Sequence, residues 1–534
     1  MLISRRALNE YLDRELRSFL WMKKLRRDEL LEELSRFKVQ PKFKTTPWLH
    51  QLVCFYIGMC EPRFLFLLDM GLGKSKILSD LITQTQREGD LRRALILVPN
   101  VVNMASWKDD LAVHSELEPW LCNVSNIEEK WDRLVDPDGD VTVIDYQGLQ
   151  WALCEKVPVK PKKKTNKATK VKYQLVPNPK RIRQVQRLYN FVGIDESHKL
   201  RNADNLWSDL VGQISASADR VYATTGTVFG KNPEEMWSQF KLVDGGETFG
   251  ENLSLFHEAF FYASPHDFKG TVWEFDERRL GEVTRMMQHK SIRYDEKEVP
   301  EVELPSRVNV IRKVDMAGEQ REHFLLALQN LLNAQGIGDP VALEAPWLRM
   351  RQIASGYLCW KDADGQHIVY FKENPKMDAL EALLSEMGEE KVVICYDYTD
   401  TGRMIVKRLN ELHIGCEWLY GGTKDKVGVR DKFMHDPKCR VLVMNSEAGG
   451  TGNDGLQKAA RFMIFYESPT PPITRKQTEK RIHRPGQRSR CFIYDVVMRK
   501  SGDQTILDNI AEGRDLFEQV VNGRRLSKKI FDEA

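Results

Sequence analysis

The chain has 534 residues, with 80 lysines and arginines against 77 aspartates and glutamates, which gives a formal net charge of +3. This length is too great for one hydrophobic core and indicates two to four domains. The near balance of charge excludes a global basic excess, so any affinity for nucleic acid has to be local.

The apolar runs of the chain are short, and FLFLL at 64–68, among the longest, cannot cross a bilayer. The first residues, MLISRRALNEYLDREL, carry acidic side chains where a secretory signal needs an apolar stretch. We therefore expect an intracellular protein without a membrane partner, cytoplasmic in a bacterium or an infected cell and nuclear in a eukaryote. The nine cysteines are scattered singly, without a CxxC pair, and are interpreted as reduced packing residues.

Residues 1–46 are predicted to form an N-terminal helical extension. The stretch ELRSFLWMKKLRRDELLEELSRF has helical character. Its simplest interpretation is a helix pair packed on the domain that follows.

Short apolar runs then occur in two sets, separated by segments of helical length. They lie at 64–69, 93–99, 141–146, 190–195 and 220–226, and again at 391–397, 439–445, 461–467 and 491–497. Such runs, alternating with longer amphipathic stretches, are typical of buried parallel strands with crossover helices. The sequence therefore predicts an α/β fold with two parallel-sheet lobes, over residues 47–232 and 373–500.

Three further segments accompany these lobes. Residues 233–372 are predicted to be helical insertions, because leucines recur at helical spacing in EQREHFLLALQNLLNA at 319–334. Residues 501–534 are predicted to be a C-terminal helical brace. Residues 156–183 are rich in lysine and proline with little periodicity, which predicts a flexible loop or insert.

A glycine-rich turn follows the first predicted strand, in LLDMGLGKSKILSDL. In such a turn the backbone N–H groups around Gly71 and Gly73 point at phosphates, and the next helix adds its positive dipole end. Lys74 would reach the β and γ phosphates of a nucleotide, and Ser75 would ligate Mg²⁺. The strict pattern has glycine where this chain has Leu68, and the alternative is a plain glycine turn whose lysine faces solvent.

The fourth predicted strand ends in GIDESHKL, which brings Asp195 and Glu196 to the edge of the sheet where ligands bind. Neighbouring buried carboxylates are costly without a cation, so Mg²⁺ is the expected partner. Asp195 would hold the metal through water, and Glu196 would orient and deprotonate an attacking water. The alternative is an acidic loop start that caps a helix.

A second cluster of charge lies near the C-terminus, in QTEKRIHRPGQ at 477–487, which sets Arg481, His483 and Arg484 close together. One interpretation is a solvated basic helix end. The other is that the arginines meet a negative charge supplied from elsewhere in the protein.

With the next motif, TTGTVFGKNPEEMWSQF, the order of motifs resembles the superfamily-two helicase motor, and specifically the Swi/Snf family of double-stranded DNA translocases. Asp69–Ser75 is similar to the family's phosphate loop, with one residue missing and the leading glycine absent. The other first-lobe motifs match at Gln51, at Asp195, Glu196 and His198, and at Thr225–Thr227.

The second lobe is similar to the family as well, in SEAGGTG at 446–452 and in QTEKRIHRPGQ. The resemblance extends over about residues 46–515. It departs from the family after Gly452, where NDGLQKA is slightly longer than usual, and at 470–472, where TPP replaces tryptophan-asparagine-proline. The matched positions of the last motif are Gln477, Arg481, His483, Arg484, Gly486 and Gln487.

This resemblance implies two RecA-like lobes in tandem that bind and hydrolyse ATP with Mg²⁺. It places Gln51, Gly452 and Gln477 at the nucleotide. Arg481 and Arg484 would be arginine fingers that reach the γ-phosphate when the lobes close, because guanidinium groups stabilise developing charge with a fork that lysine lacks. Alternate closing and opening would move the protein along nucleic acid.

Contacts to the nucleic acid are expected to be with its backbone, independent of sequence and strongly salt-dependent. The lysine-rich insert at 156–183 is one candidate, and ordinary solvation of a charge run is the alternative. The other candidates, each of which ordinary surface placement would also explain, are Asn100, Trp107, Lys199, Arg201 and Gly421–Lys424.

We therefore expect an ATP-dependent translocase that acts as a monomer on duplex or branched DNA. A nearly bare motor suggests a bacterial or phage protein that remodels DNA in replication, recombination or repair. A strand-separating helicase and an RNA-dependent motor of the same superfamily are alternatives. A non-catalytic DNA-binding scaffold would have damaged motifs, whereas the expected catalytic side chains are all present: Lys74, Asp195, Glu196, Arg481 and Arg484.

Overall fold

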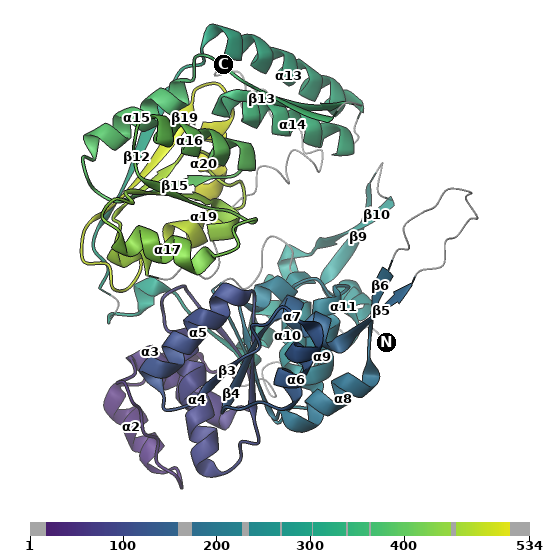
Figure 1. Ribbon diagram of the computed structural model, residues 1–534. Coiled ribbons are helices and arrows are strands. Elements are labelled where there is room, and N and C mark those ends of the chain that lie inside the picture. Colours follow the sequence, from purple (N-terminus) through teal and green to yellow (C-terminus); the bar gives the residue numbers. More distant parts are fainter. Residues whose placement is uncertain are drawn as a thin grey trace. The chain divides into compact units, whose positions relative to one another are not determined.

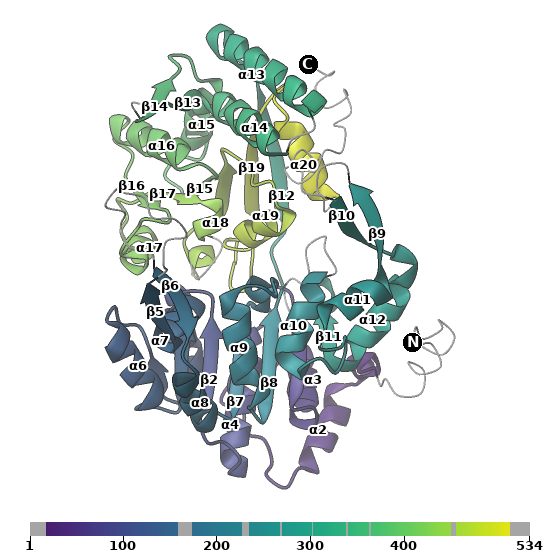
Figure 2. The ribbon, with the colours of Figure 1, turned by 90° about the vertical axis from the view of Figure 1, so that its right-hand side faces the viewer.

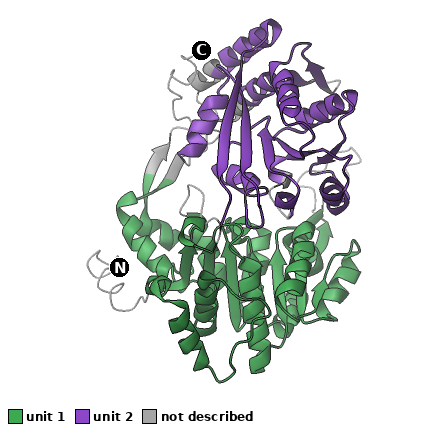
Figure 3. Cartoon of the chain, turned by 90° about the vertical axis from the view of Figure 1, so that its left-hand side faces the viewer, with its two compact units in different colours: residues 1–302 green, residues 303–534 purple. Residues whose placement is uncertain are grey.

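The structure, a computed structural model, describes residues 18–158, 173–226, 234–266, 270–301, 303–337, 340–362, 365–449 and 455–512. The chain divides into two compact units, residues 1–302 and residues 303–534, drawn green and purple in Figure 3. Each unit contains one large sheet, so the α/β class with two parallel-sheet lobes is confirmed.

The sheet of unit 1 is parallel throughout its described strands (Figure 1). Its five predicted strands are present, and one further strand extends the sheet at each edge. In sheet order the strands are β11 (Ser291–Tyr294), β1 (Arg63–Leu68), β8 (Arg220–Thr225), β7 (Phe191–Asp195), β2 (Ala94–Val98), β4 (Val141–Asp145) and β3 (Pro119–Leu121).

Both faces of this sheet are covered, because its strands are apolar on both sides. In β1, Leu65 and Leu67 pack in one core, and Phe64, Phe66 and Leu68 pack in the other. The core around Phe64 is covered by α2 (Arg27–Ser35), α3 (Leu49–Cys60), α4 (Lys74–Glu88) and α5 (Val101–His114). The core around Leu65 is covered by α6 (Ile127–Val135), α7 (Tyr146–Leu153), α8 (Pro179–Leu188), α9 (Leu206–Ala216), α10 (Glu234–Asp244), α11 (Leu253–Phe260) and α12 (Leu280–Lys290).

Unit 2 is built on a second parallel sheet (Figure 2). Its four predicted strands lie at the centre. In sheet order the strands are β12 (Arg307–Val314), β19 (Cys491–Met498), β18 (Phe462–Phe465), β15 (Val392–Tyr396), β17 (Val441–Asn445) and β16 (Cys416–Leu419). Its helices include α15 (Pro375–Glu386), α16 (Thr399–Glu411), α17 (Lys426–His435), α18 (Ser446–Gly449) and α19 (Pro472–Glu479).

A separate helical core lies at one end of unit 2. It joins α13 (Gly318–Ile337) and α14 (Pro340–Ser355) to α20 (Asp503–Ala511) through side chains such as Phe324, Trp347 and Ile506. The helix predicted at 319–334 is therefore present as α13.

The segment between the lobes differs from the prediction. Residues 233–372 are predicted to be helical insertions, but they also contain β11, which joins the sheet of unit 1, and β12, which joins that of unit 2. Two antiparallel hairpins also occur here, β9 (Phe261–His266) with β10 (Gly270–Phe275) and β13 (Tyr357–Asp362) with β14 (Gly365–Tyr370). The boundary between the units falls at residues 302 and 303, inside this segment.

The basic insert is also more regular than predicted where the structure describes it. Strands β5 (Cys154–Pro158) and β6 (Tyr173–Pro177) pair as an antiparallel hairpin, and α8 begins two residues later behind an Asn178 cap. Residues 159–172, which hold most of its lysines, lie outside the described residues.

The described part of the N-terminal extension contains a 3₁₀ helix at Leu20–Lys24 and α2. Among the residues that the structure describes, no helix is long and apolar enough to span a membrane. The cysteines are free thiols, and six of them are buried: Cys54, Cys122, Cys154, Cys395, Cys439 and Cys491.

Candidate active site

The phosphate loop connects the buried end of β1 to the start of α4 in unit 1. Gly71 and Gly73 have φ angles of +85° and +74°, in the left-handed region where a side chain would be strained. A Cβ on Gly73 would also overlap the amide nitrogen of Gln51. The first helical residue is Lys74. The strand, turn and helix that phosphate binding requires are therefore in place.

Gln51 holds this loop from the first turn of α3. Its Oε1 accepts a hydrogen bond from the Trp48 amide at 2.9 Å, and its Nε2 donates to the Leu72 carbonyl at 3.2 Å. The same carbonyl accepts from Nε2 of His50 at 2.8 Å, and burial lowers the pKa of His50. The side chain predicted to lie at the nucleotide thus also fixes the shape of the phosphate loop.

Lys74 and Glu196 form an ion pair, with 2.8 Å between Nζ and Oε1, and only 12% and 15% of their side chains are exposed. The other carboxylate oxygen of Glu196 lies 3.2 Å from Nδ1 of His198. Burial would raise the pKa of Glu196, but Lys74 and His198 outweigh it and hold this pKa well below its usual range. The site therefore contains an ionised carboxylate.

Glu196 also has a backbone conformation that is uncommon for its residue type. Its φ is +52°, in the left-handed region, directly after β7 ends at Asp195. Strained residues of this kind persist where the surrounding structure fixes them, and they are frequent at active sites. The turn directs the Glu196 carboxylate toward Lys74.

Asp195 is held by hydrogen bonds to both of its carboxylate oxygens. Nε1 of Trp107 donates to Oδ2 at 3.0 Å, and the Thr224 hydroxyl donates to Oδ1 at 3.0 Å. Burial raises the pKa of Asp195, and the neighbouring charge of Glu196 raises it further. The charge of Lys74 and the hydrogen bonds from Trp107 and Thr224 lower this pKa, so these three neighbours favour the ionised carboxylate.

Ser75, the first candidate ligand of Mg²⁺, donates a short hydrogen bond from its hydroxyl to Asp110 of α5. Its backbone carbonyl accepts from Ser79 within α4 at 2.8 Å. Asp110 was not among the predicted site residues. No local motif marks it, and its only signal is a position three residues after Trp107 on the helix that follows β2.

The donor set of this site fits Mg²⁺ bound together with a nucleotide. Ser75, Asp195 and Glu196 supply oxygens, which are the ligands that Mg²⁺ prefers. Within the described residues, no group of three or more His, Cys, Asp or Glu could hold a metal by itself. At nucleotide sites Mg²⁺ usually takes phosphate and water ligands in addition to one or two from the protein.

One of the predicted contacts to nucleic acid is wrong. Trp107 is only 2% exposed, because its indole packs in the core and its N–H is used on Asp195. Asn100 is half-buried and caps α5 by accepting from the Val102 and Asn103 amides, which does not test its predicted contact. Lys199, Arg201 and Lys424 are exposed, and their predicted role stays open.

The basic insert continues into an exposed basic face on α8. Lys180, Arg183 and Arg187 are exposed and line a shallow pocket of about 550 Å³, whereas Ile182 and Val185 on the other side of the helix are buried. This spacing gives one charged and one apolar face.

The last motif lies in unit 2, at and after α19. Gln477 is half-buried on this helix, Arg481 is only 3% exposed and Arg484 is half-buried. His483 donates to the Pro305 carbonyl at 2.9 Å, and Gln487 donates to the carbonyls of Ala460 and Ile482. His483 and Gln487 therefore shape the turn that carries the arginines. Gly452 lies outside the described residues.

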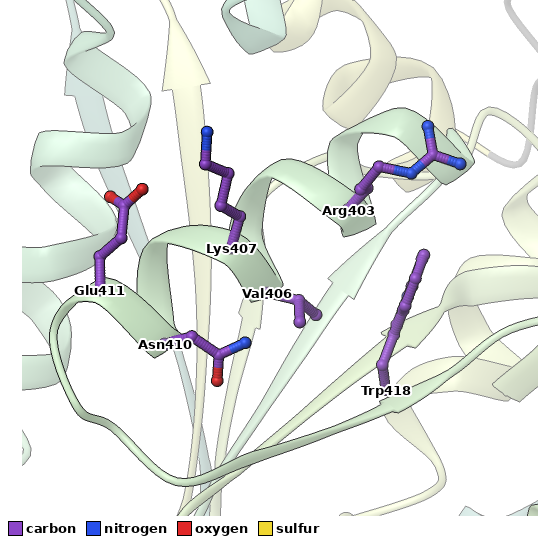
Figure 4. A pocket seen from close by; sticks show the side chains of 6 residues that line it. All are labelled: Arg403, Val406, Lys407, Asn410, Glu411 and Trp418. Atoms are coloured by element: carbon purple, nitrogen blue, oxygen red, sulfur yellow. The ribbon is translucent and has the colours of Figure 1, made fainter.

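A further pocket of about 570 Å³ lies on the surface of unit 2 between α16 and β16 (Figure 4). None of the predicted site residues line it. The lining side chains are Arg403, Val406, Lys407, Asn410, Glu411 and Trp418.

Comparison with known proteins identifies a family. Residues 19–346 match the family model of the SNF2-related domain. The CHD3-type chromatin-remodeling factor CHR7 of Arabidopsis thaliana is 21% identical over 62% of this chain and 27% of its own length. The DNA repair and recombination protein RAD54-like of Drosophila ananassae is 27% identical over 29% of this chain and 20% of its own. The chain thus spans about a quarter of the length of such relatives.

The solved structures that are similar to this chain include the Sulfolobus solfataricus SWI2/SNF2 ATPase core in complex with dsDNA. It is 18% identical, with 93% of this chain and 98% of that chain covered and a TM-score of 0.38.

Proposed function

Because the chain belongs to the SNF2-related family, we propose that it is a DNA-dependent ATPase that translocates along double-stranded DNA. The observation that carries the proposal is the convergence of Lys74, Glu196, Asp195 and Ser75 at one end of the unit 1 sheet, next to a loop shaped for phosphate. The relatives named for chromatin remodelling and for DNA repair and recombination support DNA as the track.

The ion pair between Lys74 and Glu196 suggests how the site responds to a nucleotide. Lys74 would exchange the Glu196 carboxylate for phosphate oxygens, which offer more negative charge. Glu196 would then be free to accept a hydrogen bond from the attacking water while His198 holds its other oxygen. When bound, Mg²⁺ supplies charge that neutralises the phosphates, and Ser75 and Asp195 are the residues that would hold it.

Unit 2 would contribute the positive charge that the transition state requires. Arg481 and Arg484 remain our candidates for arginine fingers, and Gln477 and Gly452 our candidates for nucleotide contacts from this unit. Translocation would follow if two lobes that each hold the DNA backbone close on ATP and open after hydrolysis. We further propose that the protein acts as a monomer in the cytoplasm, on DNA structures that arise in repair, recombination or replication.

The direct experiment is the ATPase rate of the purified chain with single-stranded, duplex and forked DNA and with duplex RNA. We expect stimulation by duplex or forked DNA and little by RNA. Displacement of the third strand of a triplex without unwinding of a duplex would support translocation over strand separation. A chain that binds DNA but hydrolyses no ATP would replace this proposal by that of a non-catalytic scaffold.

A further inference from the structure

Helix α5 is anchored at both ends. Asn100 caps its N-terminus, and Nζ of Lys44 donates to the carbonyls of Ala112 and Ser115 at its C-terminus, at 3.0 and 2.9 Å. Along its inner face, Met104 and Leu111 are buried in the core that also holds α4. The helix therefore has little freedom to move relative to the phosphate loop.

The same helix contacts both groups that would face Mg²⁺. Trp107 donates to Asp195, and Asp110, three residues later, accepts from Ser75. Side chains three residues apart lie on one face of a helix. Asp195 and Ser75 come from different elements, β7 and α4, so α5 is the common support of the two.

Each contact orients an oxygen that would ligate Mg²⁺. A hydroxyl that presents its lone pairs to a cation has to direct its O–H elsewhere, and the Asp110 carboxylate accepts the hydrogen bond that Ser75 donates. A carboxylate that holds a metal through water needs a fixed rotation. The N–H of Trp107 and the hydroxyl of Thr224 fix the two oxygens of Asp195, and each oxygen retains a further lone pair.

We propose that Trp107 and Asp110 are positioning residues for the Mg²⁺-nucleotide complex, and that α5 aligns Ser75 and Asp195 as one unit. This inference rests on the proposed function. Residues that orient metal ligands by hydrogen bonds typically contribute about 10-fold to 100-fold in metal affinity or activity. The effect of α5 should therefore be seen as a change in how much Mg²⁺ strengthens nucleotide binding.

The test compares the affinity of a fluorescent ATP analogue in Mg²⁺ and in EDTA. Asp110→Ala removes the acceptor of the Ser75 proton, and Trp107→Phe removes the indole N–H while keeping an aromatic ring. We expect each to reduce the Mg²⁺-dependent gain in affinity by about 10-fold, with little change in EDTA. Asp110→Asn, whose amide oxygen can still accept a hydrogen bond from the Ser75 hydroxyl, should recover most of the gain.

The matched control is Trp120→Phe, which removes an indole hydrogen bond to the Arg133 carbonyl at 2.9 Å elsewhere in unit 1. It should leave the Mg²⁺-dependent gain unchanged. Thermal unfolding of each nucleotide-free variant verifies the fold, and the Asp110 variants carry the test alone if Trp107→Phe does not fold.

Two outcomes would overturn the inference alone. In the first, Asp110→Ala and Trp107→Phe both keep the Mg²⁺-dependent gain in nucleotide affinity that the wild type shows. In the second, both variants lose affinity equally with and without Mg²⁺, which would indicate a purely structural role. A wild-type chain that binds nucleotide no better in Mg²⁺ than in EDTA would overturn the proposed function, and this inference with it.

Discussion

The ammonium group of Lys74 lies 2.8 Å from the Glu196 carboxylate, which joins the residue expected to bind phosphate to the residue expected to activate water. Neither side chain can perform its proposed task while the pair is intact, because each occupies the position where the other's substrate would bind. Under the proposed function, a bound nucleotide would therefore have to break this pair.

Substitution of either partner should stop turnover without unfolding the chain. We expect Lys74→Ala and Glu196→Gln to abolish ATP hydrolysis while DNA binding persists, because both side chains lie at the proposed nucleotide site and both remain partly exposed. The measurements are DNA-stimulated ATPase, duplex affinity and thermal unfolding. Near-normal hydrolysis in either folded variant would remove these residues from the active site.

The basic face of α8 and the lysine-rich segment before it should bind the DNA backbone. Replacing Lys180, Arg183 and Arg187 by serine should weaken duplex binding and flatten the dependence of log affinity on log salt concentration. Each lost phosphate contact is worth about 0.9 in this slope. Replacing the lysines of 159–172 should act in the same direction.

The control for this experiment is the serine replacement of Lys38 and Lys42, which are also exposed but lie far from α8 in the sequence. Stability should hardly change in any of these variants, since the replaced side chains bury little surface. A salt slope equal to that of the wild type would identify the α8 face as an ordinary solvated surface.

The two arginines of unit 2 should affect turnover more than nucleotide affinity. Arg484→Ala is expected to lower the DNA-stimulated ATPase rate about a thousandfold, or about 4 kcal/mol of transition-state stabilisation, with nucleotide affinity within a few-fold of wild type. Arg484→Lys should restore little, because it keeps the charge and loses the fork. Arg481→Ala should act similarly but also cost stability, since this side chain is buried.

Equal losses in turnover and nucleotide affinity would mean that the arginines bind ATP in the ground state, and would contradict the finger role. Unchanged rates would instead leave the two arginines with a purely structural role.

A buried ion pair in α4 gives a prediction about stability and pH. Lys76 Nζ lies 2.8 Å from Asp80 Oδ2, with 4% of each side chain exposed, and burial raises the pKa of Asp80 to about 6. Asp80→Ala alone should destabilise the protein by about 3–5 kcal/mol because it leaves a buried charge, whereas Lys76→Met with Asp80→Leu should be neutral or stabilising.

The sign of the pH dependence follows from the raised pKa of Asp80. The folded protein binds this proton more tightly than the unfolded chain, so the contribution of Asp80 to stability is fully present below pH about 3.8 and is lost as pH rises through about 6. Unfolding free energies of the double variant, relative to wild type, should therefore increase from pH 4.5 to 7.5. A difference that is flat with pH would show that Asp80 is not protonated more readily in the folded state.

The central strands were predictable because they are buried on both faces and read as continuous apolar runs. The strands that were missed are at or next to the sheet edges, where that signal fails. β12 alternates exposed and half-buried residues, β3 has three residues and β11 and β16 have four. Their places depend on pairing with distant strands, which local periodicity does not record.

The same distinction between local and distant signals applies to the residues of the candidate site. The phosphate loop and the Asp195 and Glu196 pair could be predicted, because local motifs carry them. The contacts of Trp107 with Asp195 and of Asp110 with Ser75 join residues far apart in the chain, and no spacing rule marks them. Without that tertiary information, Trp107 was assigned to a surface contact, although its indole is buried.

The position of β1 has a consequence for how the chain is made. β1 is the first strand of unit 1 to be synthesised, yet its neighbours in the sheet are β8 and β11, and Leu65 pairs with Ser291. Chains emerge from the ribosome N-terminus first, and pairings this distant are slow to form. Until residue 294 has been translated, one edge of the apolar segment RFLFLL has no strand to cover it. Nascent chains that stall before that point would expose an aggregation-prone edge.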